Sequence, residues 1–211
     1  RIIDVASGEQ IHNLPTDKTN ILKFIPETHL LTVADYSDNI ELWDVQTGEL
    51  VETVTTEDDA MFYFSDDAQY MVSRSSERLT LQNIRTGAIL FDDVPVHLGQ
   101  FRDVDISSRD DLMATAGVDG TVRFWDLRSR DQVRLFFAHT NGVSQVEFAP
   151  NRRYVATLGD DGVKLWDYRF DEIRELAFFE FLAITDNELY FSADGSLLFA
   201  HVFDEIIVWS V

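Results

Sequence analysis

The sequence predicts an all-β fold built from one repeated unit. Four apolar stretches end in a tryptophan motif, at 40–44, 122–126, 163–167 and 206–210. A fifth stretch has the same pattern with Gln82 in the tryptophan position. The steps from Trp43 to Gln82 and on through the three later tryptophans are 39, 43, 41 and 43 residues. A period near 40 residues with four strands per unit is typical of a β-propeller blade.

Each unit is expected to contain strands a to d, with the tryptophan at the end of strand c. In the clearest copy, strand a is 143–148, strand b is 154–158 and strand c is 163–167. Pro150 and Asn151 are typical of the turn between strands a and b. Overlaying the copies predicts units at about 1–20, 21–59, 60–100, 101–142, 143–187 and 188–211. The first is a c–d remnant and the last has strands a to c.

These units amount to about five blades plus a partial blade, in one domain over 1–211. Two arrangements are compatible with them. A strand at 9–14 could pair with the last unit and close a ring of five blades. Alternatively, the units are part of a ring of seven or more blades. We expect the second arrangement, because the first leaves residues 1–5 without a partner strand, and open strand edges promote aggregation.

The repeats resemble those of WD40 proteins over nearly the whole chain. The resemblance is carried by the tryptophans in register and by the aspartates in the turns between strands b and c. It implies a propeller, usually of seven blades, that acts as a rigid platform for protein partners. The turn at 44–48, Asp-Val-Gln-Thr-Gly, resembles turns of bacterial members, which are often parts of larger proteins.

The resemblance also implies a hydrogen-bonded tetrad, made of a His before strand a, a Ser or Thr in strand b, an Asp in the b–c turn and the Trp of strand c. Two units supply all four residues: His97, Thr115, Asp119 and Trp125, then His139, Thr157, Asp161 and Trp166. The other units are incomplete. They offer Thr32, Asp38 and Trp43 with Pro15 in place of the His, Ser73 with Glu77 and Gln82, and Asp204 with Trp209. A buried polar group left unpaired costs about 1–3 kcal/mol, so incomplete units should be looser.

Charge and cysteine content limit the classes of partner. The net charge of −21 disfavours nucleic acid and anionic membranes, both of which it would repel. No run of 18 apolar residues is present to span a membrane. The absence of cysteine excludes disulfides and thiolate metal sites, and it fits a reducing compartment, so we expect a cytoplasmic protein.

The sequence offers little for catalysis or metal binding. None of the five histidines forms a pair at metal-ligand spacing. Doubled aspartates such as Asp110-Asp111 fall in predicted turns, where Asp bonds its own backbone. Strand a carries only scattered polar residues, namely Lys23, Asp103, Asp105 and Gln145. We therefore expect no catalytic residue, metal, cofactor or small-molecule substrate.

Arginines gather in the a–b and c–d turns of two neighbouring units, and these turns share one face of a propeller. They are Arg109, Arg128, Arg130, Arg152, Arg153 and Arg169. We expect Arg128, Arg130, Arg152 and Arg153 to bind an acidic partner segment, because Arg contacts carboxylates through two donors. Alternatively, the arginines pair with local acids such as Asp111 and Asp131. On the opposite face, Tyr36, Arg102 and Phe203 are candidate contact residues.

The prediction for function is a non-catalytic scaffold that binds other proteins or other domains of the same parent chain. One alternative is a sensor or regulatory domain within a larger signalling or ATPase protein. A more distant alternative is an enzyme whose site lies in the propeller channel and is lined by polar residues of strand a.

Overall fold

The structure, a computed structural model, consists of β-strands joined by turns and loops in the part of the chain that it describes. The described residues are 1–16, 21–24, 29–34, 39–55, 61–65, 69–74, 78–84, 86–107, 110–151, 153–169, 174–180, 188–202 and 205–211. Within these ranges the strands form antiparallel sheets in chain order. The prediction of an all-β fold with repeated four-stranded sheets is confirmed.

The strands follow the predicted repeat closely. A two-stranded sheet comes first, with β1 (Ile2–Ile3) and β2 (Gln10–His12). The second sheet contains β3 (Ile21–Phe24), β4 (Leu30–Ala34), β5 (Asn39–Asp44) and β6 (Glu49–Thr55). The third contains β7 (Met61–Phe64), β8 (Tyr70–Arg74), β9 (Arg78–Asn83) and β10 (Ile89–Pro95).

The later sheets have the same order of neighbours. The fourth contains β11 (Phe101–Ser107), β12 (Leu112–Gly117), β13 (Thr121–Asp126) and β14 (Gln132–Phe137). The fifth contains β15 (Val143–Phe148), β16 (Tyr154–Gly159), β17 (Gly162–Asp167) and β18 (Arg174–Glu180). The last has three strands, β19 (Glu188–Phe191), β20 (Leu197–Val202) and β21 (Glu205–Ser210).

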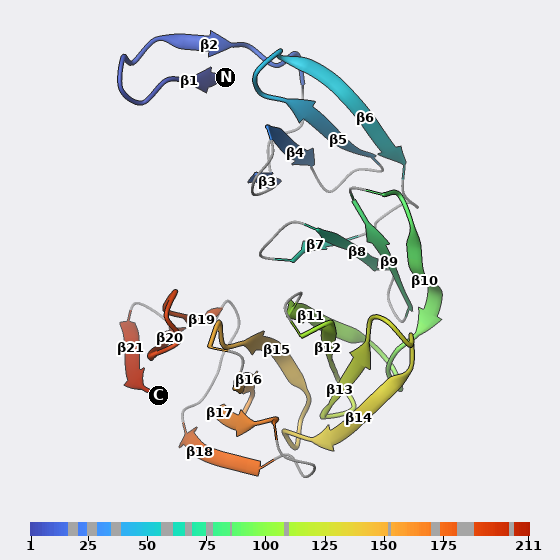
Figure 1. Cartoon of the computed structure of the whole chain (residues 1–211). Helices are drawn as coiled ribbons and strands as arrows, with labels where there is room; N and C mark the ends of the chain where they lie inside the picture. The colour runs from blue at the N-terminus through green and yellow to red at the C-terminus, as the bar shows by residue number, and fades with distance from the viewer. Residues whose placement is uncertain are drawn as a thin grey trace.

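The sheets are arranged side by side around an open arc (Figure 1). The first strands of the sheets, β3, β7, β11, β15 and β19, lie on the inner side of this arc, and β6, β10, β14 and β18 lie on its outer rim. The sheet β1–β2 stands at one end and the sheet β19–β21 at the other, with a gap between them. β2 pairs with β1, and β21 pairs with β20. The closure of five blades through a strand at 9–14 is therefore not what the structure adopts.

Apolar side chains between neighbouring sheets form the core. Between β7–β10 and β11–β14, Leu79, Leu81 and Trp125 belong to one buried cluster. Between β11–β14 and β15–β18, Phe124 and Trp166 belong to another. The sheet β11–β14 therefore contributes to the core on both of its faces. Among the described residues, no helix has the length and apolar character needed to cross a membrane.

Candidate functional site

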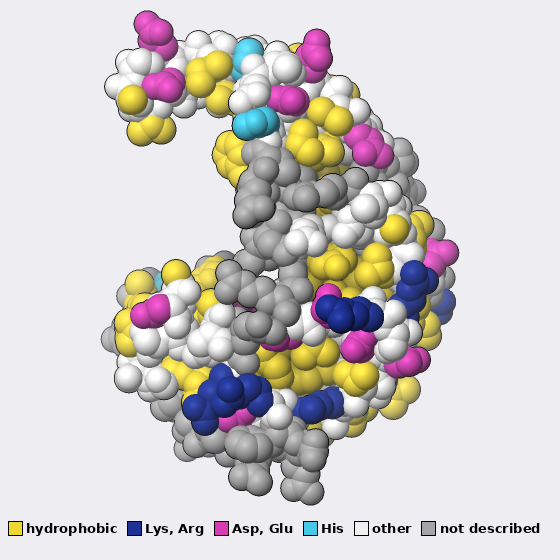
Figure 2. All heavy atoms as spheres, viewed as in Figure 1, with side chains coloured by type: hydrophobic (Ala, Val, Ile, Leu, Met, Phe, Trp, Pro, Cys, Tyr) yellow, Lys and Arg dark blue, Asp and Glu magenta, His cyan; other side chains and the backbone are white. Residues whose placement is uncertain are grey.

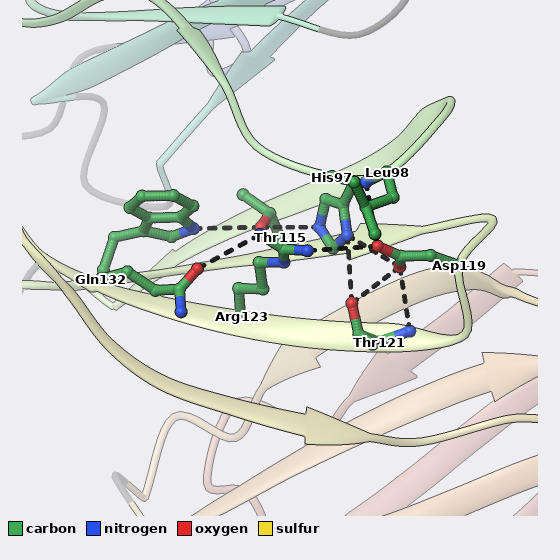
Figure 3. Close-up of polar contacts among 8 residues, drawn as sticks. His97, Leu98, Thr115, Asp119, Thr121, Arg123 and Gln132 are labelled. Carbon is green, nitrogen blue, oxygen red and sulfur yellow. Dashed lines mark hydrogen bonds and ion pairs between the residues drawn. The ribbon is translucent and has the colours of Figure 1, made fainter.

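The sheet β11–β14 brings the first four predicted tetrad residues together (Figure 3). The indole Nε1–H of Trp125 donates to Thr115 Oγ1 at 3.1 Å, and Thr115 Oγ1 lies 2.9 Å from His97 Nε2. His97 Nδ1 lies 3.0 Å from Asp119 Oδ1. Thr121 Oγ1 also donates to this carboxylate, at 2.7 Å. The chain of bonds joins strands β12 and β13 to the segment that precedes β11.

The sheet β15–β18 repeats this arrangement one unit later. Trp166 Nε1–H donates to Thr157 Oγ1 at 2.9 Å, and Thr157 Oγ1 lies 2.8 Å from His139 Nε2. His139 Nδ1 bonds the Asp161 carboxylate. Both threonine side chains and His139 are fully buried. The two tetrads therefore fix the same connection, from strand c through strand b to the loop before strand a, in consecutive sheets.

The protonation of these imidazoles follows from their surroundings. Burial lowers the pKa of His97 and of His139, although Asp119 and Asp161 partly oppose this effect. A neutral imidazole has one N–H, and an ionised carboxylate can only accept. We therefore assign the proton to Nδ1, where it is donated to the aspartate, and the threonine hydroxyl donates to Nε2. For Asp119, burial would raise the pKa, but bonds from Thr121, the Leu98 N–H and His97 outweigh it and lower the pKa to about 2.

Two glycines that the sequence analysis did not single out also belong to these sites. A Cβ built on Gly117 would overlap the imidazole of His97, and one on Gly159 would overlap that of His139. Neither glycine has positive φ, so the requirement is the close approach of the ring rather than the backbone conformation. The signal was present in the sequence, because each glycine stands two residues after the threonine of its tetrad.

The units without a full tetrad use other bonds. Trp43 donates its indole N–H to Glu41 Oε2 at 2.9 Å, and Pro15 is exposed. Gln82, in the tryptophan position of its unit, donates from Nε2 to the Gly87 carbonyl at 3.4 Å. A small cavity of about 20 Å³ lies beside Gln82. Asp38, Glu77 and Asp204 lie outside the described residues.

Polar side chains of strand a join neighbouring sheets. Asp103 Oδ2 accepts the Val146 N–H at 2.9 Å, and Asp105 Oδ2 accepts the Phe148 N–H at 2.6 Å, so β11 is bonded to β15. Gln145 makes two bonds to the backbone of Leu189 in β19, one donated at 2.9 Å and one accepted at 2.8 Å. These are three of the four residues on which a channel site would depend. Their bonds to the backbone give them a role in holding the inner strands together.

We call the described arginines of these turns the arginine face; they are Arg128, Arg130, Arg153 and Arg169. Arg128 pairs with Asp111 at 2.5 Å, and its side chain is 80% exposed. Arg153 pairs with Asp167 at 3.0 Å. The first ion pair joins an a–b turn to a c–d turn, and the second joins an a–b turn to the end of β17, where the c–d turn begins, so these turns share one side of their sheets. On the face shown in Figure 2, Lys and Arg side chains gather in the half of the arc that contains β11 to β18.

Arg130 and Arg169 differ from the other two members of the arginine face. Both side chains are exposed, and within the described ranges neither guanidinium forms an ion pair or hydrogen bond. An open hollow of about 670 Å³ lies beside Arg169, lined also by Arg134, Tyr168 and Asn151. The expectation that the arginines pair with local acids therefore holds for Arg128 and Arg153. Arg130 and Arg169 form no such pair within the described ranges, although the charge of Arg169 helps to lower the pKa of Asp167.

The remaining predicted contact residues are only partly placed. Arg152, Tyr36 and Phe203 lie outside the described residues. Arg102 is exposed on β11, and its carbonyl accepts a bond from the Tyr63 hydroxyl at 3.1 Å. Within the described ranges, no group of three or more His, Asp or Glu side chains has the arrangement of a metal site.

The two sheets that contain the tetrads match a known protein-family model. The model described as "WD domain, G-beta repeat" matches residues 93–126 and 130–167. Each match contains one complete tetrad, from His97 to Trp125 and from His139 to Trp166. These two stretches are similar to WD40 repeats. A second model, described as "Eukaryotic translation initiation factor eIF2A", matches residues 2–86, which include two of the units with incomplete tetrads.

Similar proteins include several with WD repeats in their names. WD repeat-containing protein 55 homolog of Dictyostelium discoideum is 28% identical over 84% of this chain and 46% of its own length. Pre-mRNA-processing factor 19 of Oryza sativa is 24% identical over 80% of this chain and 34% of its own length. Small ribosomal subunit protein RACK1y of Oryza sativa is 33% identical over 54% of this chain and 36% of its own length.

The chain spans less than half the length of each of these relatives. All three come from eukaryotes, so they give no support to the expectation, based on the turn at 44–48, of a bacterial type of WD40 protein.

Proposed function

We propose that this chain is a non-catalytic platform that binds other proteins or other parts of its own protein. The observation that carries the proposal is the use of its polar interior. The imidazoles of His97 and His139 are bonded inside the tetrads, and Asp103, Asp105 and Gln145 bond the backbone of the next sheet. The groups that could do chemistry are thus engaged in holding neighbouring blades rigid, and a rigid base is what positions binding loops.

The binding surface that we propose is the arginine face, and its partner is an acidic segment. Arg130 and Arg169 offer exposed guanidinium groups that form no ion pair with a described acid. Carboxylates are the natural ligands of such groups, because Arg presents parallel N–H donors. The chain as a whole is strongly acidic, with a net charge of −21, so an acidic segment would be repelled elsewhere and steered toward the arginine face. A cytoplasmic location, expected from the absence of cysteine, stays a prediction.

The experiment is cross-linking of the full-length protein in cells, followed by identification of the linked peptides. We expect links from the side of the arginine face to segments rich in Asp and Glu. Reversal of Arg128, Arg130, Arg152 and Arg153 to Glu should remove these links, whereas reversal of the exposed Arg78 on β9 should not. Links to the same protein would indicate a regulatory contact, and links to others a scaffold. Partner links that persist after reversal at full yield would exclude the arginine face.

A further inference from the structure

The outer strand β14 presents an apolar stripe to solvent. Val133, Leu135 and Phe137 alternate along it and are 47%, 51% and 61% exposed. The residues between them face the other way, since Phe136 packs into the core cluster and Arg134 donates to the Tyr168 carbonyl at 2.5 Å. Among the described strands, β14 pairs only with β13, along one of its two edges. It lies on the outer rim of the arc (Figure 1).

The stripe can be compared at equal register with the outer strands β6 and β10. β5 and β13 shift register at the same step before tryptophan, so Thr53 of β6 is the equivalent of Leu135 in β14. Natural edge strands avoid unwanted pairing by carrying charges or proline. At the register of the stripe, β6 carries exposed Val51 and Thr53, and β10 carries exposed Asp92 and Pro95. The stripe on β14 contains neither a charged residue nor a proline.

The turn that leads into β14 is unusual as well. Arg130 has φ +67°, the left-handed region, whereas the equivalent positions in other c–d turns are Gly8, Gly48 and Gly87 with φ between +67° and +73°. An L residue is less stable than glycine in this conformation. The chain thus keeps an exposed, unpaired guanidinium at a position where glycine would fit better. A residue held at such a disadvantage is a candidate for a role in binding.

We infer that the outer edge of β14 docks an extended protein segment that adds to the sheet as a fifth strand. The segment has apolar residues at alternate positions, which cover Val133, Leu135 and Phe137, and acidic residues between them, one of which reaches Arg130. Strand addition takes its affinity from backbone hydrogen bonds and its specificity from alternate side chains. A second copy of this chain fits less well, because each copy carries a net charge of −21. The inference rests on the proposed function and names the partner segment.

The probe is a fluorescent decapeptide of alternating Val and Glu, titrated into the full-length protein by anisotropy. We expect Leu135→Lys to weaken binding about tenfold, because it places a charge in the apolar stripe. Attraction of charge alone would instead strengthen binding to this variant. Arg130→Gly should weaken binding about two- to fivefold, the size expected for one exposed ion pair. The matched control is Thr53→Lys on β6, which should leave the affinity unchanged.

Two further peptides test the strand geometry. One carries N-methyl groups on its odd residues and the other on its even residues, so each lacks the N–H donors of one edge. We expect only one of them to lose binding, since one edge of an added strand faces β14. Equal binding of all three peptides, or no binding of the unmodified one, would overturn the inference. A dimer that Leu135→Lys dissociates would instead assign the edge to a second copy.

Failure of the β14 inference can be distinguished from failure of the proposed function. If the platform proposal fails, cross-linking yields no partner segment, whatever the peptide does. If only the β14 inference fails, partners are found and bind the Leu135→Lys protein with unchanged affinity.

Discussion

Nε2 of His97 lies 2.9 Å from the hydroxyl oxygen of Thr115, inside the sheet β11–β14. This contact links the loop before strand a to the middle of strand b, and the indole of Trp125 completes it from strand c. The threonine hydroxyl is the centre of the arrangement, because it accepts from the indole and donates to the imidazole. Loss of the hydroxyl would leave two buried groups without partners.

Substitution of the second of these hydroxyls, Thr157→Val, should therefore lower the free energy of unfolding. Valine has nearly the same shape, so the change removes hydrogen bonds with little change in packing volume. Trp166 Nε1–H and His139 Nε2 would both lose their partner, at about 1–3 kcal/mol for each buried group. Urea unfolding followed by tryptophan fluorescence measures the loss. The control is Thr140→Val at an exposed position, and equal midpoints for both variants would contradict the expectation.

The histidine pKa values predict how stability depends on pH. Burial lowers the pKa of His97 and His139 in the folded state, so the unfolded chain binds protons more readily. Stability that depends on the neutral imidazoles is present above the ordinary pKa of about 6.5 and is lost as the pH falls below it. Asp119, with a pKa of about 2, adds stability that is present above its ordinary value and is lost as the pH falls from about 4 toward 2.

Thermal unfolding from pH 8 to pH 3 should accordingly show two descending steps, one below pH 6.5 and one below pH 4. The charged groups around the imidazoles act on the same titration: Asp119 and Arg123 for His97, and Asp161 and Lys164 for His139. The double variant His97→Gln and His139→Gln should be less stable at pH 8 and should lack the upper step. An upper step of full size in this variant would assign it to other histidines.

The repeat could be predicted from the sequence because its signal is local. Tryptophans at a constant period, Gly-containing turns and alternating apolar residues each depend on a few neighbouring positions, and the four-stranded sheets follow them. Asp103 and Asp105 show where such reasoning stops. Alone, they are polar residues on an inner strand and suggest a channel site. Their role depends on the backbone of β15, which is 43 residues away along the chain.

Arg130 shows a second limit. In the sequence it is one of six turn arginines, and its charge is its evident property. Its φ of +67° sets it apart from Arg128, and that value follows from the geometry of the hairpin rather than from the residue itself. The glycines at the equivalent positions were the available signal, since the turn at 126–130 has arginine where its counterparts have glycine. The pairing of Arg128 with Asp111 could be expected because their turns share one face. The bond from Trp43 to Glu41 could not, because Thr32 is the residue in the threonine position of that unit.

The bonds between inner strands predict a loss of stability in Asp105→Ala. Its carboxylate accepts the Phe148 N–H at 2.6 Å, and a hydrogen bond to a charged group contributes about 1.5–3 kcal/mol. We expect a loss of this size in urea unfolding, and faster hydrogen exchange at the Phe148 amide than at amides of β13. Asp131→Ala, at an exposed turn position, is the matched control. Unchanged exchange at Phe148 would mean that the carboxylate does not protect it.

The conformation of Arg130 predicts the opposite effect, a gain of stability. Arg130→Gly removes the steric penalty of a side chain at φ +67°, which is about 1–2 kcal/mol for an L residue. The greater freedom of glycine in the unfolded chain offsets part of this gain, so we expect a net increase of about 1 kcal/mol. The reverse change, Gly87→Arg, tests the same quantity, because Gly87 also has φ +67° and a Cβ there would meet nothing within 4 Å. It should destabilise the protein by a similar amount. Differential scanning calorimetry measures the transition temperature of both variants and of the unchanged protein. A higher temperature for Arg130→Gly and a matching decrease for Gly87→Arg would mean that the backbone at position 130 disfavours arginine. Equal transition temperatures for all three proteins would remove this argument for a role of Arg130 in binding.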